Sequence, residues 1–331
     1  MNKTYIIIDL ANMFSRARHI TKGDIDQKVR LAISITMTSI RKAWNDFEAD
    51  HLVFCLEGRS WRKDFYKPYK ANRTDKKTAM SPVAKEEDDM YWGALSEMQT
   101  FLSDKTNCTV LQHPILEADD LVSGWIDAHP KDKHIIISSD SDFLQLISNN
   151  VYQYNGVSET LTTDNGVFDH KGKPVVNKKT GNPNPPIDPE WILFEKCIRG
   201  DTSDNIFSAY PGVRKKGSKN RVGLLEAFED KNRKGFSWNN LMLQRWIDHQ
   251  GDEHRVVDDY TRNVTLIDLR AQPYDIRNII NETVEKVEPK NNMQIGVRLL
   301  KFCSSWDLET IADQVETYAK IFSSKYEKDM L

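Results

Sequence analysis

Four short apolar runs in the first part of the chain are predicted to be buried strands. Runs that are apolar throughout, rather than alternating with polar residues, are typical of strands covered on both faces of a sheet. Such strands separated by helices indicate βαβ units and a parallel sheet. We therefore expect an α/β fold with a mostly parallel central sheet flanked by helices. The runs are YIIID (5–9), HLVFCLE (51–57), CTVLQ (108–112) and HIIIS (134–138).

The segments between these runs have the spacing of amphipathic helices. In residues 25–48, apolar side chains recur at helical intervals from Val29 to Trp44. Residues 84–103 and 117–128 are predicted to be helices on the same ground. The 331-residue chain is long enough to bury a sizeable core, and it has no apolar run long enough to span a membrane.

Two stretches of the chain are strongly basic, although the net charge of the whole is −3. Residues 58–77 contain eight Lys or Arg and two Asp, a net charge of 8 − 2 = +6. Prolines at 68 and 82 favour a loop or mobile arch over residues 58–82. Residues 211–223 carry five basic side chains and no acidic one. Stretches of this kind supply phosphate contacts in proteins that bind nucleic acid.

The pattern changes after residue 150. The segment 152–163 predicts a hairpin with Asn155-Gly156 at its turn, and residues 170–187 predict a surface excursion rich in Gly and Pro. From Asp188 the chain is predicted to be helical almost to its end. We therefore expect two regions: an α/β core at 1–187, which includes a basic arch at 58–90, and a helical region at 188–331.

Acidic side chains stand where each predicted strand ends. In open parallel sheets the carboxyl ends of the strands meet at one edge, where ligands bind. Any single acid has another explanation, because Asp and Glu also favour helix N-termini. Together, however, so many carboxylates repel one another unless cations neutralise them. The acids are Asp9, Glu57, Glu117, Asp119, Asp120, Asp140 and Asp142, followed later by Asp201 and Asp204 in RGDTSDN.

An acidic edge without His or Cys ligands indicates hard divalent cations, Mg²⁺ or Mn²⁺. Two such ions about 3.5–4 Å apart can activate a water and stabilise the leaving oxygen in phosphoryl transfer. Carboxylates for metal and cations for phosphate together predict hydrolysis of nucleic acid. The cysteines have no zinc-site spacing, and we expect them to be buried and reduced: Cys55, Cys108, Cys197 and Cys303.

Five motifs make the chain resemble the 5′ nuclease (flap endonuclease) superfamily, and within it the tailed-phage exonucleases called phage RNase H. The matching segments follow one another in the family's order from residue 6 to residue 206. They are IIIDLANMF (6–14), WRKDFYKPYKANR (61–73), LEADDLVSGW (116–125), IIISSDSDFLQL (135–146) and RGDTSDNI (199–206).

The resemblance implies a role for each acid. One Mg²⁺ would be surrounded by Asp9, Glu57, Glu117 and Asp119, with Asp120 close by, and Mn²⁺ would substitute for it. A second ion would be surrounded by Asp142, Asp201 and Asp204, with Asp140 near both ions. We count Asp9 and Asp140 as catalytic, together with Lys70 and Arg73 of the arch.

The resemblance also implies contacts with nucleic acid. In the family's YKxNR element, Lys70 and Arg73 would meet the scissile phosphate and Tyr69 would lie near the terminal bases, while Arg62 matches another basic arch position. A helix–turn–helix element follows in the family, expected here at about residues 204–230, and it often holds K⁺ while gripping duplex phosphates. Its basic residues here are Arg214, Lys215, Lys216, Lys219 and Arg221.

The chain departs from the family's pattern in four places. Position 57 is Glu where the family usually has Asp, so the metal geometry must adjust. FSAY (207–210) is an insertion, and GVRKKG (212–217) replaces the usual turn, which puts the K⁺ site in doubt. Acidic residues at 86–89 make the far side of the arch less adhesive to DNA.

These observations predict a 5′-to-3′ exonuclease that also cleaves flaps and has RNase H activity. We expect branched or nicked duplex DNA and RNA–DNA hybrid as substrates, and primer or flap removal in phage replication as the role. We also expect a monomer in the bacterial host cytoplasm, without membrane contact. Replication proteins such as a single-strand binding protein or a clamp are the candidate partners.

Two alternatives stay open. A PIN-type ribonuclease shares the acidic sheet edge, but it would be shorter and would lack the arch and the RGDTSDN-to-PGVRKKG continuation. A catalytically silent DNA-binding module becomes credible only if Glu57 prevents metal binding.

Overall fold

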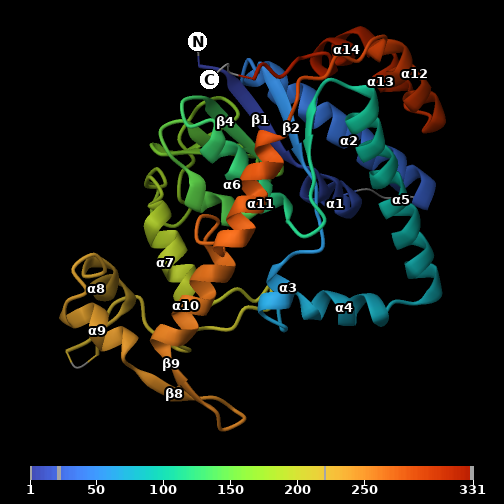
Figure 1. Cartoon of the computed structure of the whole chain (residues 1–331). Coiled ribbons are helices and arrows are strands. Elements are labelled where there is room, and N and C mark those ends of the chain that lie inside the picture. The colour runs from blue at the N-terminus through green and yellow to red at the C-terminus, as the bar shows by residue number, and fades with distance from the viewer. Residues whose placement is uncertain (1, 21–23, 220, 329–331) are drawn as a thin grey trace. The chain divides into compact units, whose positions relative to one another are not determined.

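The computed structural model describes residues 2–20, 24–219 and 221–328, without the side chains of 17–20, 74 and 76. The chain forms two compact units, whose elements are labelled in Figure 1. The first unit comprises Met1–Ser60, Ala79–Pro186 and Asn278–Leu331, and the second comprises Trp61–Thr78 and Ile187–Arg277. Within the described residues, no helix is both long and apolar enough to cross a membrane.

The predicted α/β fold is confirmed by the seven-stranded sheet of the first unit, ordered β3-β2-β1-β4-β5-β6-β7. The strands from β3 to β5 are parallel, and β6 and β7 extend the sheet in the antiparallel sense. The bounds are β1 Thr4–Asp9, β2 His51–Cys55, β3 Thr109–Leu111, β4 Lys133–Ile137, β5 Val151–Asn155, β6 Thr160–Thr163 and β7 Gly166–Asp169.

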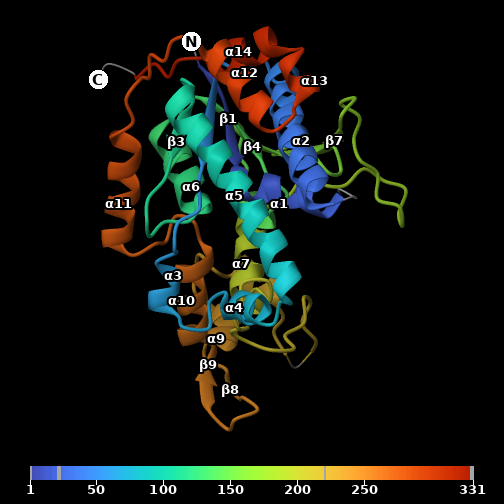
Figure 2. The same ribbon diagram turned by 90° about the vertical axis from the view of Figure 1, so that its right-hand side faces the viewer.

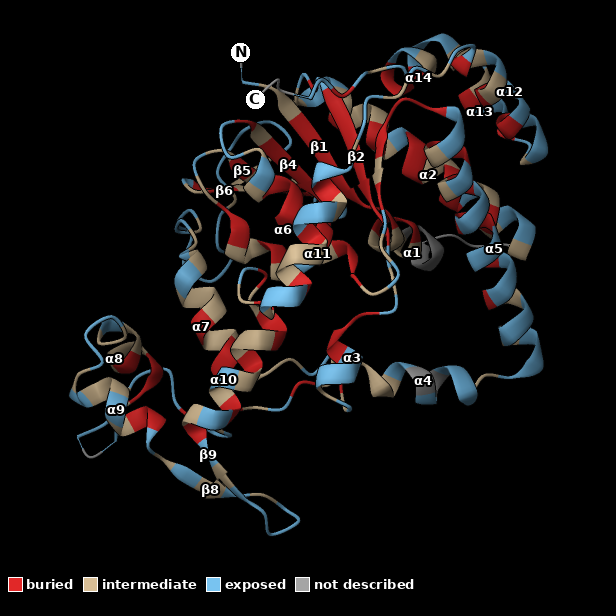
Figure 3. Cartoon of the chain, viewed as in Figure 1, coloured by how far each residue is buried: buried red, intermediate tan, exposed pale blue. Residues whose placement is uncertain are grey.

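Helices cover both faces of this sheet, which explains why the central strands are apolar throughout. Burial runs almost unbroken along β1, β2 and β4 (Figure 3). On one face of the sheet, Ile6 and Ile8 pack into a core with a group of helices that Figure 2 shows together. These helices are α2 (Ile25–Asp46), α5 (Pro82–Lys105), α12 (Ile295–Ser305), α13 (Glu309–Ala312) and α14 (Val315–Phe322).

The opposite face is covered by α6 (Ala118–Ala128), whose Trp125 meets the Tyr5 ring edge-on at 5.3 Å between centroids. The helix α11 (Tyr274–Glu285) packs on α6 at Gly124, because a Cβ there would lie 2.3 Å from Ile280 Cγ2. Glycine at position 124 therefore permits the close approach of these two helices.

The second unit is mainly helical. Its core contains Phe194, Ile198, Leu224, Leu241 and Val256. A two-stranded hairpin interrupts the helices, although the sequence pattern had predicted helix throughout. The bounds are α3 Arg62–Phe65, α4 Ala71–Thr78, α7 Pro189–Arg199, α8 Leu224–Glu229, α9 Phe236–Met242, β8 Arg245–Ile247, β9 Glu253–Arg255 and α10 Val256–Ile267.

The sequence-based division at residue 187 differs from the two units in two places. Trp61–Thr78 belongs to the second unit, where Arg62 Nε donates a 2.8 Å hydrogen bond to the Leu266 carbonyl. Residues 278–331 return to the first unit, where the apolar faces of α12–α14 complete the core. A single domain boundary divides the chain by residue number. Packing instead brings together apolar segments that are far apart in the chain.

Several local predictions need correction. The segment 58–82, predicted as a loop, contains α3 and α4, because a helix of polar residues such as α4 carries no apolar stripe to reveal it. The helix α1 (Leu10–Ile20) was not predicted. A 3₁₀ turn, Ser141–Leu146, follows β4. The hairpin of β5 and β6 is confirmed, but its turn takes in residues 156–159.

A cluster of histidines and aromatic rings closes the amino-terminal edge of the sheet. His51 Nε2 accepts from the Thr109 backbone N at 3.2 Å, so this nitrogen is unprotonated. His134 Nε2 lies 2.9 Å from the His129 carbonyl, and its Nδ1 is buried with no hydrogen-bond partner among the described residues. His129 Nε2 lies 3.0 Å from Tyr326 Oη, which ties the C-terminal segment to the same edge.

We expect this unit to lose stability as the pH falls below about 6.5, the ordinary pKa of histidine. Burial lowers the pKa of His51 to about 3 and that of His134 to about 4. The unfolded chain takes up these protons first, so the stabilisation is complete above the unfolded pKa and is lost as the pH falls towards the folded pKa. Each histidine then accounts for roughly 2 kcal/mol of unfolding free energy lost at pH 5.

Urea unfolding at pH 7.5 and pH 5 measures this loss. The variant His134→Gln removes one titrating group, so its unfolding free energy should change by about 2 kcal/mol less between the two conditions than that of the parent. The control is His170→Gln, at an exposed histidine, and its unfolding free energy should keep the pH dependence of the parent. Equal pH dependence in the parent and His134→Gln would contradict the assignment.

Candidate active site

The carboxyl ends of β1 and β4 form a topological switch point. From β1 the chain adds β2 and β3 on one side and then β4 and β5 on the other. Ligands bind in the crevice at such a point. Asn12 links the two strand ends, since its backbone N donates to Asp9 Oδ1 at 3.1 Å and its Oδ1 accepts from Ser139 N at 3.3 Å. Asp9 ends β1, and Asp140 follows β4 by three residues.

Three of the predicted metal ligands surround the end of β2. Burial raises the pKa of the Cys55 thiol well above its usual value, and the negative charges of Asp9, Glu57 and Asp119 raise it further. Asp9 pairs in register with Cys55 of β2, two residues before Glu57, and Asp119 is the second residue of α6, so the three acids come from three different elements. Glu57 is exposed, and its Oε2 accepts from the Ala118 backbone N at 3.3 Å, so the longer side chain reaches the N-terminus of α6.

Glu117 and Asp120 lie deeper than the other acids and fix the start of α6. Glu117 is 4% exposed, and its Oε2 accepts from Ser60 Oγ at 2.6 Å. Asp120 is fully buried, and its Oδ2 accepts from the Glu117 backbone N at 3.1 Å. This reciprocal arrangement is a capping box. Asp120 thus has a structural role that accounts for its position without a metal ion.

Asp140 and Asp142 follow β4 on the 3₁₀ turn. Asp140 is exposed and caps this turn, because its Oδ1 accepts from the Asp142 backbone N at 2.9 Å. The Asp140 carbonyl accepts from Gln153 Nε2 at 2.6 Å, which anchors the turn to β5. Asp142 is half-buried. The first unit therefore presents seven predicted acidic residues at the carboxyl ends of its strands: Asp9, Glu57, Glu117, Asp119, Asp120, Asp140 and Asp142.

Asp201 and Asp204 belong to the second unit, on the loop after α7. Gly200 begins this loop at a φ of 73°, and a Cβ there would meet the Ile206 carbonyl at 2.3 Å. Burial alone would raise the pKa of Asp201, but hydrogen bonds from Lys196 and Ser203 outweigh it and lower the pKa to about 2. Lys196 Nζ lies 2.7 Å from Asp201 Oδ2, so this carboxylate is held in its charged form.

The YKxNR element of the same unit encloses Asp204. The Lys70 backbone N donates to the Asp204 carbonyl at 2.8 Å, and Lys70 has a φ of 53°. Tyr69 Oη donates to Asp204 Oδ2 at 3.1 Å, and Arg73 Nη2 donates to Oδ1 at 2.8 Å. Lys70 Nζ lies 3.6 Å from Oδ2. The predicted phosphate-binding residues are thus positioned by an acidic side chain.

Two of the predicted nucleic-acid contacts are buried in this structure. Arg62 is fully buried, and its guanidinium lies over the Trp61 ring at 4.7 Å while Nε bonds to α10. Tyr69 is 3% exposed and packs with Ile206 and Leu266, so its own unit covers most of the ring. Both side chains hold the basic element in place. Sequence alone marks a residue as basic or aromatic but does not show which of its faces is covered.

Arg16 is a candidate that the sequence analysis missed. It lies one helical turn beyond Asn12 on α1, which begins directly after Asp9. Burial lowers its pKa, and its Nε is buried without a hydrogen-bond partner among the described residues. A guanidinium whose Nε has no partner, on the helix that follows Asp9, suits a phosphate ligand. The signal in the sequence was its i+7 spacing from Asp9, within a helix that was not predicted.

The predicted helix–turn–helix segment folds around Glu226 of α8. Its carboxylate accepts from Gly217 N at 3.0 Å and from Gly223 N at 2.9 Å. A Cβ at Gly223 would lie 2.3 Å from Gly217 N, so this closure requires glycine. The loop carries the five predicted basic residues, and Lys215 Nζ lies 5.2 Å from the centre of the Trp191 ring.

Solved structures share this fold. The bacteriophage T5 5′-exonuclease, in a structure with bound zinc, aligns with a TM-score of 0.58 at 17% identity, covering 86% of this chain and 99% of that one. A complex of the bacteriophage T5 flap endonuclease with DNA and metal ions gives the same TM-score and identity, with 98% of its own chain covered. At this identity the likeness concerns the fold alone.

Curated relatives match about half of the chain. A 5′-3′ exonuclease of Mycoplasmopsis pulmonis is 30% identical over 179 residues, 54% of this chain and 52% of that protein. A DNA polymerase I of Rhizobium leguminosarum is 28% identical over 181 residues, 54% of this chain and 15% of that protein. The chain therefore aligns with about half of the first relative's length and with a much smaller share of the second.

A family model provides the remaining comparison. The model described as the N-terminal resolvase-like domain of 5′-3′ exonucleases matches residues 4–177. This match covers more than half of the chain and includes all seven acids of the first unit. The chain therefore belongs to the 5′-3′ exonuclease family, within the 5′ nuclease superfamily.

Proposed function

We propose that this chain is a divalent-metal-dependent 5′-to-3′ exonuclease that also cleaves flaps. The observation that carries the proposal is the delivery of Asp9 and Glu57 by neighbouring parallel strands to the end of the sheet where Glu57 bonds to the N-terminus of α6, beside Asp119. Membership of the 5′-3′ exonuclease family supports the reaction, and the DNA complex of the T5 flap endonuclease supports DNA as substrate. Branched or nicked duplex DNA is the substrate class we favour.

The residues present fit hard divalent cations. Asp9, Glu57, Asp119 and Asp140 offer only oxygen ligands, which suits Mg²⁺, with Mn²⁺ as a substitute. From the sequence resemblance alone, we assign Asp142, Asp201 and Asp204 to a second ion. Two bound ions would supply a nucleophile at neutral pH and stabilise the leaving oxygen.

The chain's own side chains orient the phosphate. Lys70 and Arg73 offset the charge that develops on it in the transition state. Asp204 positions both cations, because it accepts a hydrogen bond from Arg73 and lies within 3.6 Å of Lys70 Nζ. The basic loop residues Arg214, Lys215, Lys216, Lys219 and Arg221 make contacts with the backbone of the nucleic acid that are independent of base sequence.

We further propose that RNA–DNA hybrid is a substrate and that the chain removes RNA primers or flaps in phage DNA replication. The motif resemblance to phage RNase H supports this role. It would place the protein in the bacterial cytoplasm as a monomer, beside a single-strand binding protein or a clamp. A K⁺ ion at the helix–turn–helix loop is the least supported part, because GVRKKG departs from the family's turn.

The two alternatives receive less support. Membership of the 5′-3′ exonuclease family and the bond network between the YKxNR element and RGDTSDN argue against a PIN-type ribonuclease. A silent DNA-binding module required Glu57 to disrupt the acidic group. Glu57 follows the β2 residue that pairs with Asp9, and its Oε2 accepts from Ala118 N beside Asp119, which supports our inference that the longer side chain still joins the donor set.

We expect Asp142→Asn to abolish cleavage without loss of binding. Removing one negative charge from the acidic edge weakens the binding of the metal ion there. The cleavage rate should therefore fall by about two orders of magnitude or more. The measurement is product release from a 5′-labelled flap duplex in Mg²⁺, with duplex affinity measured in EDTA. Asp313→Asn, at an exposed acid of the C-terminal region, is the control. A variant Asp142→Asn that cuts at the control's rate would reject the assignment.

Arg16→Ala should slow the chemical step. Loss of a guanidinium that meets substrate phosphate should reduce the single-turnover rate by about tenfold to a hundredfold. Arg16→Lys keeps the charge and should recover part of the rate. Arg30→Ala is the matched control, because Arg30 makes an exposed ion pair with Asp307 at 3.0 Å. An unchanged rate in Arg16→Ala would remove Arg16 from the site.

A further inference from the structure

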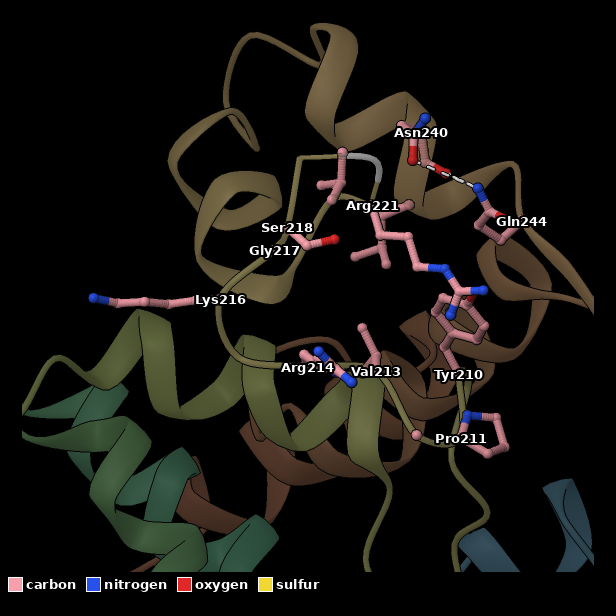
Figure 4. Close-up of a pocket in the computed structure, with 13 residues that line it drawn as sticks. Tyr210, Pro211, Val213, Arg214, Lys216, Gly217, Ser218, Arg221, Asn240 and Gln244 are labelled. Carbon is pink, nitrogen blue, oxygen red and sulfur yellow. Dashed lines mark hydrogen bonds between the residues drawn. The ribbon is translucent and has the colours of Figure 1, made fainter.

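A pocket of about 590 Å³ lies within the second unit, between the loop that follows Tyr210 and the helix α9. Figure 4 shows the side chains that line it. One wall carries Tyr210 and Arg214, a second carries Ser218 and Arg221, and the helical wall carries Asn240 and Gln244. This volume lies within the range of small-molecule sites and exceeds the needs of a lone phosphate ion.

The side chains that line this pocket carry a net positive charge. Its lining contains no Asp or Glu. Within the described part of the chain, neither Arg214 nor Arg221 forms an ion pair with a carboxylate. Arg221 extends across the pocket towards Tyr210 and Gln244, whereas Lys216 points away from it (Figure 4). Two guanidinium groups without acidic partners favour an anionic ligand.

The walls of the pocket are fixed by hydrogen bonds. Glu226 joins Gly217 to Gly223, and Ser218 pairs with Arg221 through their backbones at 2.8 Å. Gln244 Nε2 donates to the Asn240 carbonyl at 2.9 Å, which holds its amide at the rim. Because these bonds lie within the protein, the pocket is formed before a ligand enters it.

The uncharged side chains of the lining indicate which chemical group is attached to the anionic group of the ligand. The amides of Asn240 and Gln244 are of the kind that pair with the donor and acceptor edges of a nucleobase. The Tyr210 ring is of the kind on which bases stack. Tyr210 belongs to the inserted FSAY, and Arg214 belongs to GVRKKG. The pocket thus depends on segments in which this chain departs from the pattern of its family.

We propose that this pocket binds one nucleoside monophosphate unit, with the phosphate at Arg214 and Arg221 and the base towards Tyr210, Asn240 and Gln244. This proposal rests on the proposed nuclease function only in one respect, namely where the nucleotide comes from. The source is either a free mononucleotide, such as an exonuclease releases, or one nucleotide of an unpaired strand. Both sources present the same phosphate, sugar and base.

Calorimetric titration of the full chain in EDTA tests the pocket without cleavage. The probes are deoxyadenosine 5′-monophosphate, a short single-stranded deoxyadenosine oligonucleotide and inorganic phosphate. Arg221→Gln should weaken binding of the mononucleotide by about tenfold to a hundredfold, the effect of one lost charge-assisted hydrogen bond. Arg233→Gln removes the same charge from an exposed position of the same unit that lies outside the pocket lining, so it should change this affinity by less than about threefold.

The outcomes separate the alternatives. The pocket is supported if Arg221→Gln weakens binding of the mononucleotide and Arg233→Gln does not. If the oligonucleotide then binds no more tightly than the mononucleotide, the free nucleotide is the occupant. If the oligonucleotide binds more tightly and Arg221→Gln removes that extra affinity, an unpaired strand is the occupant. Equal losses in both variants, equal affinity for inorganic phosphate, or no binding at millimolar concentration would overturn the proposal.

A separate assay keeps this result distinct from the proposed nuclease. Metal-dependent cleavage of flap duplex by the parent chain reports on the nuclease alone, and nucleotide binding in EDTA reports on the pocket alone. Gln244→Leu adds a variant without any change of charge. It should weaken nucleotide binding while leaving the salt dependence of duplex affinity unchanged. Circular dichroism of each variant verifies that it is folded.

Discussion

The parallel pairing of β1 with β2 and β4, which brings carboxylates to one end of the sheet, is the constraint on which the rest of the structure depends. Parallel strands deliver Asp9 and Glu57 to one edge because they enter the sheet in the same direction. The N-terminus of α6 brings Asp119 to the same place. The fold therefore needs a rigid, apolar sheet on which these charges are held, and that sheet requires helices on both faces. The apolar strands therefore determine where the acidic side chains lie.

The strands and their acids were predictable because both signals are local. An apolar run such as IIIDL identifies a buried strand, and an acid at its end identifies the edge. The functional resemblance rested on the same short segments. By contrast, α4 is polar along its whole length, so periodicity could not reveal it. The hairpin of β8 and β9 was missed for a related reason, since each strand has three residues and no buried position.

The roles of individual site residues were harder to predict than the site. Arg62 and Asp120 have the residue types expected of phosphate and metal contacts, yet both are fully buried and serve the fold. Whether a charge faces solvent or its own backbone depends on residues far away in the chain, such as Leu266 for Arg62. Arg16 shows the converse case, because its importance emerges only from a buried Nε with no partner among the described residues.

The bonds around Asp204 have a consequence for how nucleic acid is held. Lys70 and Arg73 already have an anionic neighbour, and Tyr69 fixes its orientation. A phosphate that engages these cations enters an exchange with Asp204 rather than filling an empty position. Its net affinity is then the difference between two ion-pair energies, which is smaller than either. A processive or repeatedly acting nuclease needs such moderate affinity, because a phosphate that binds too tightly is also slow to leave.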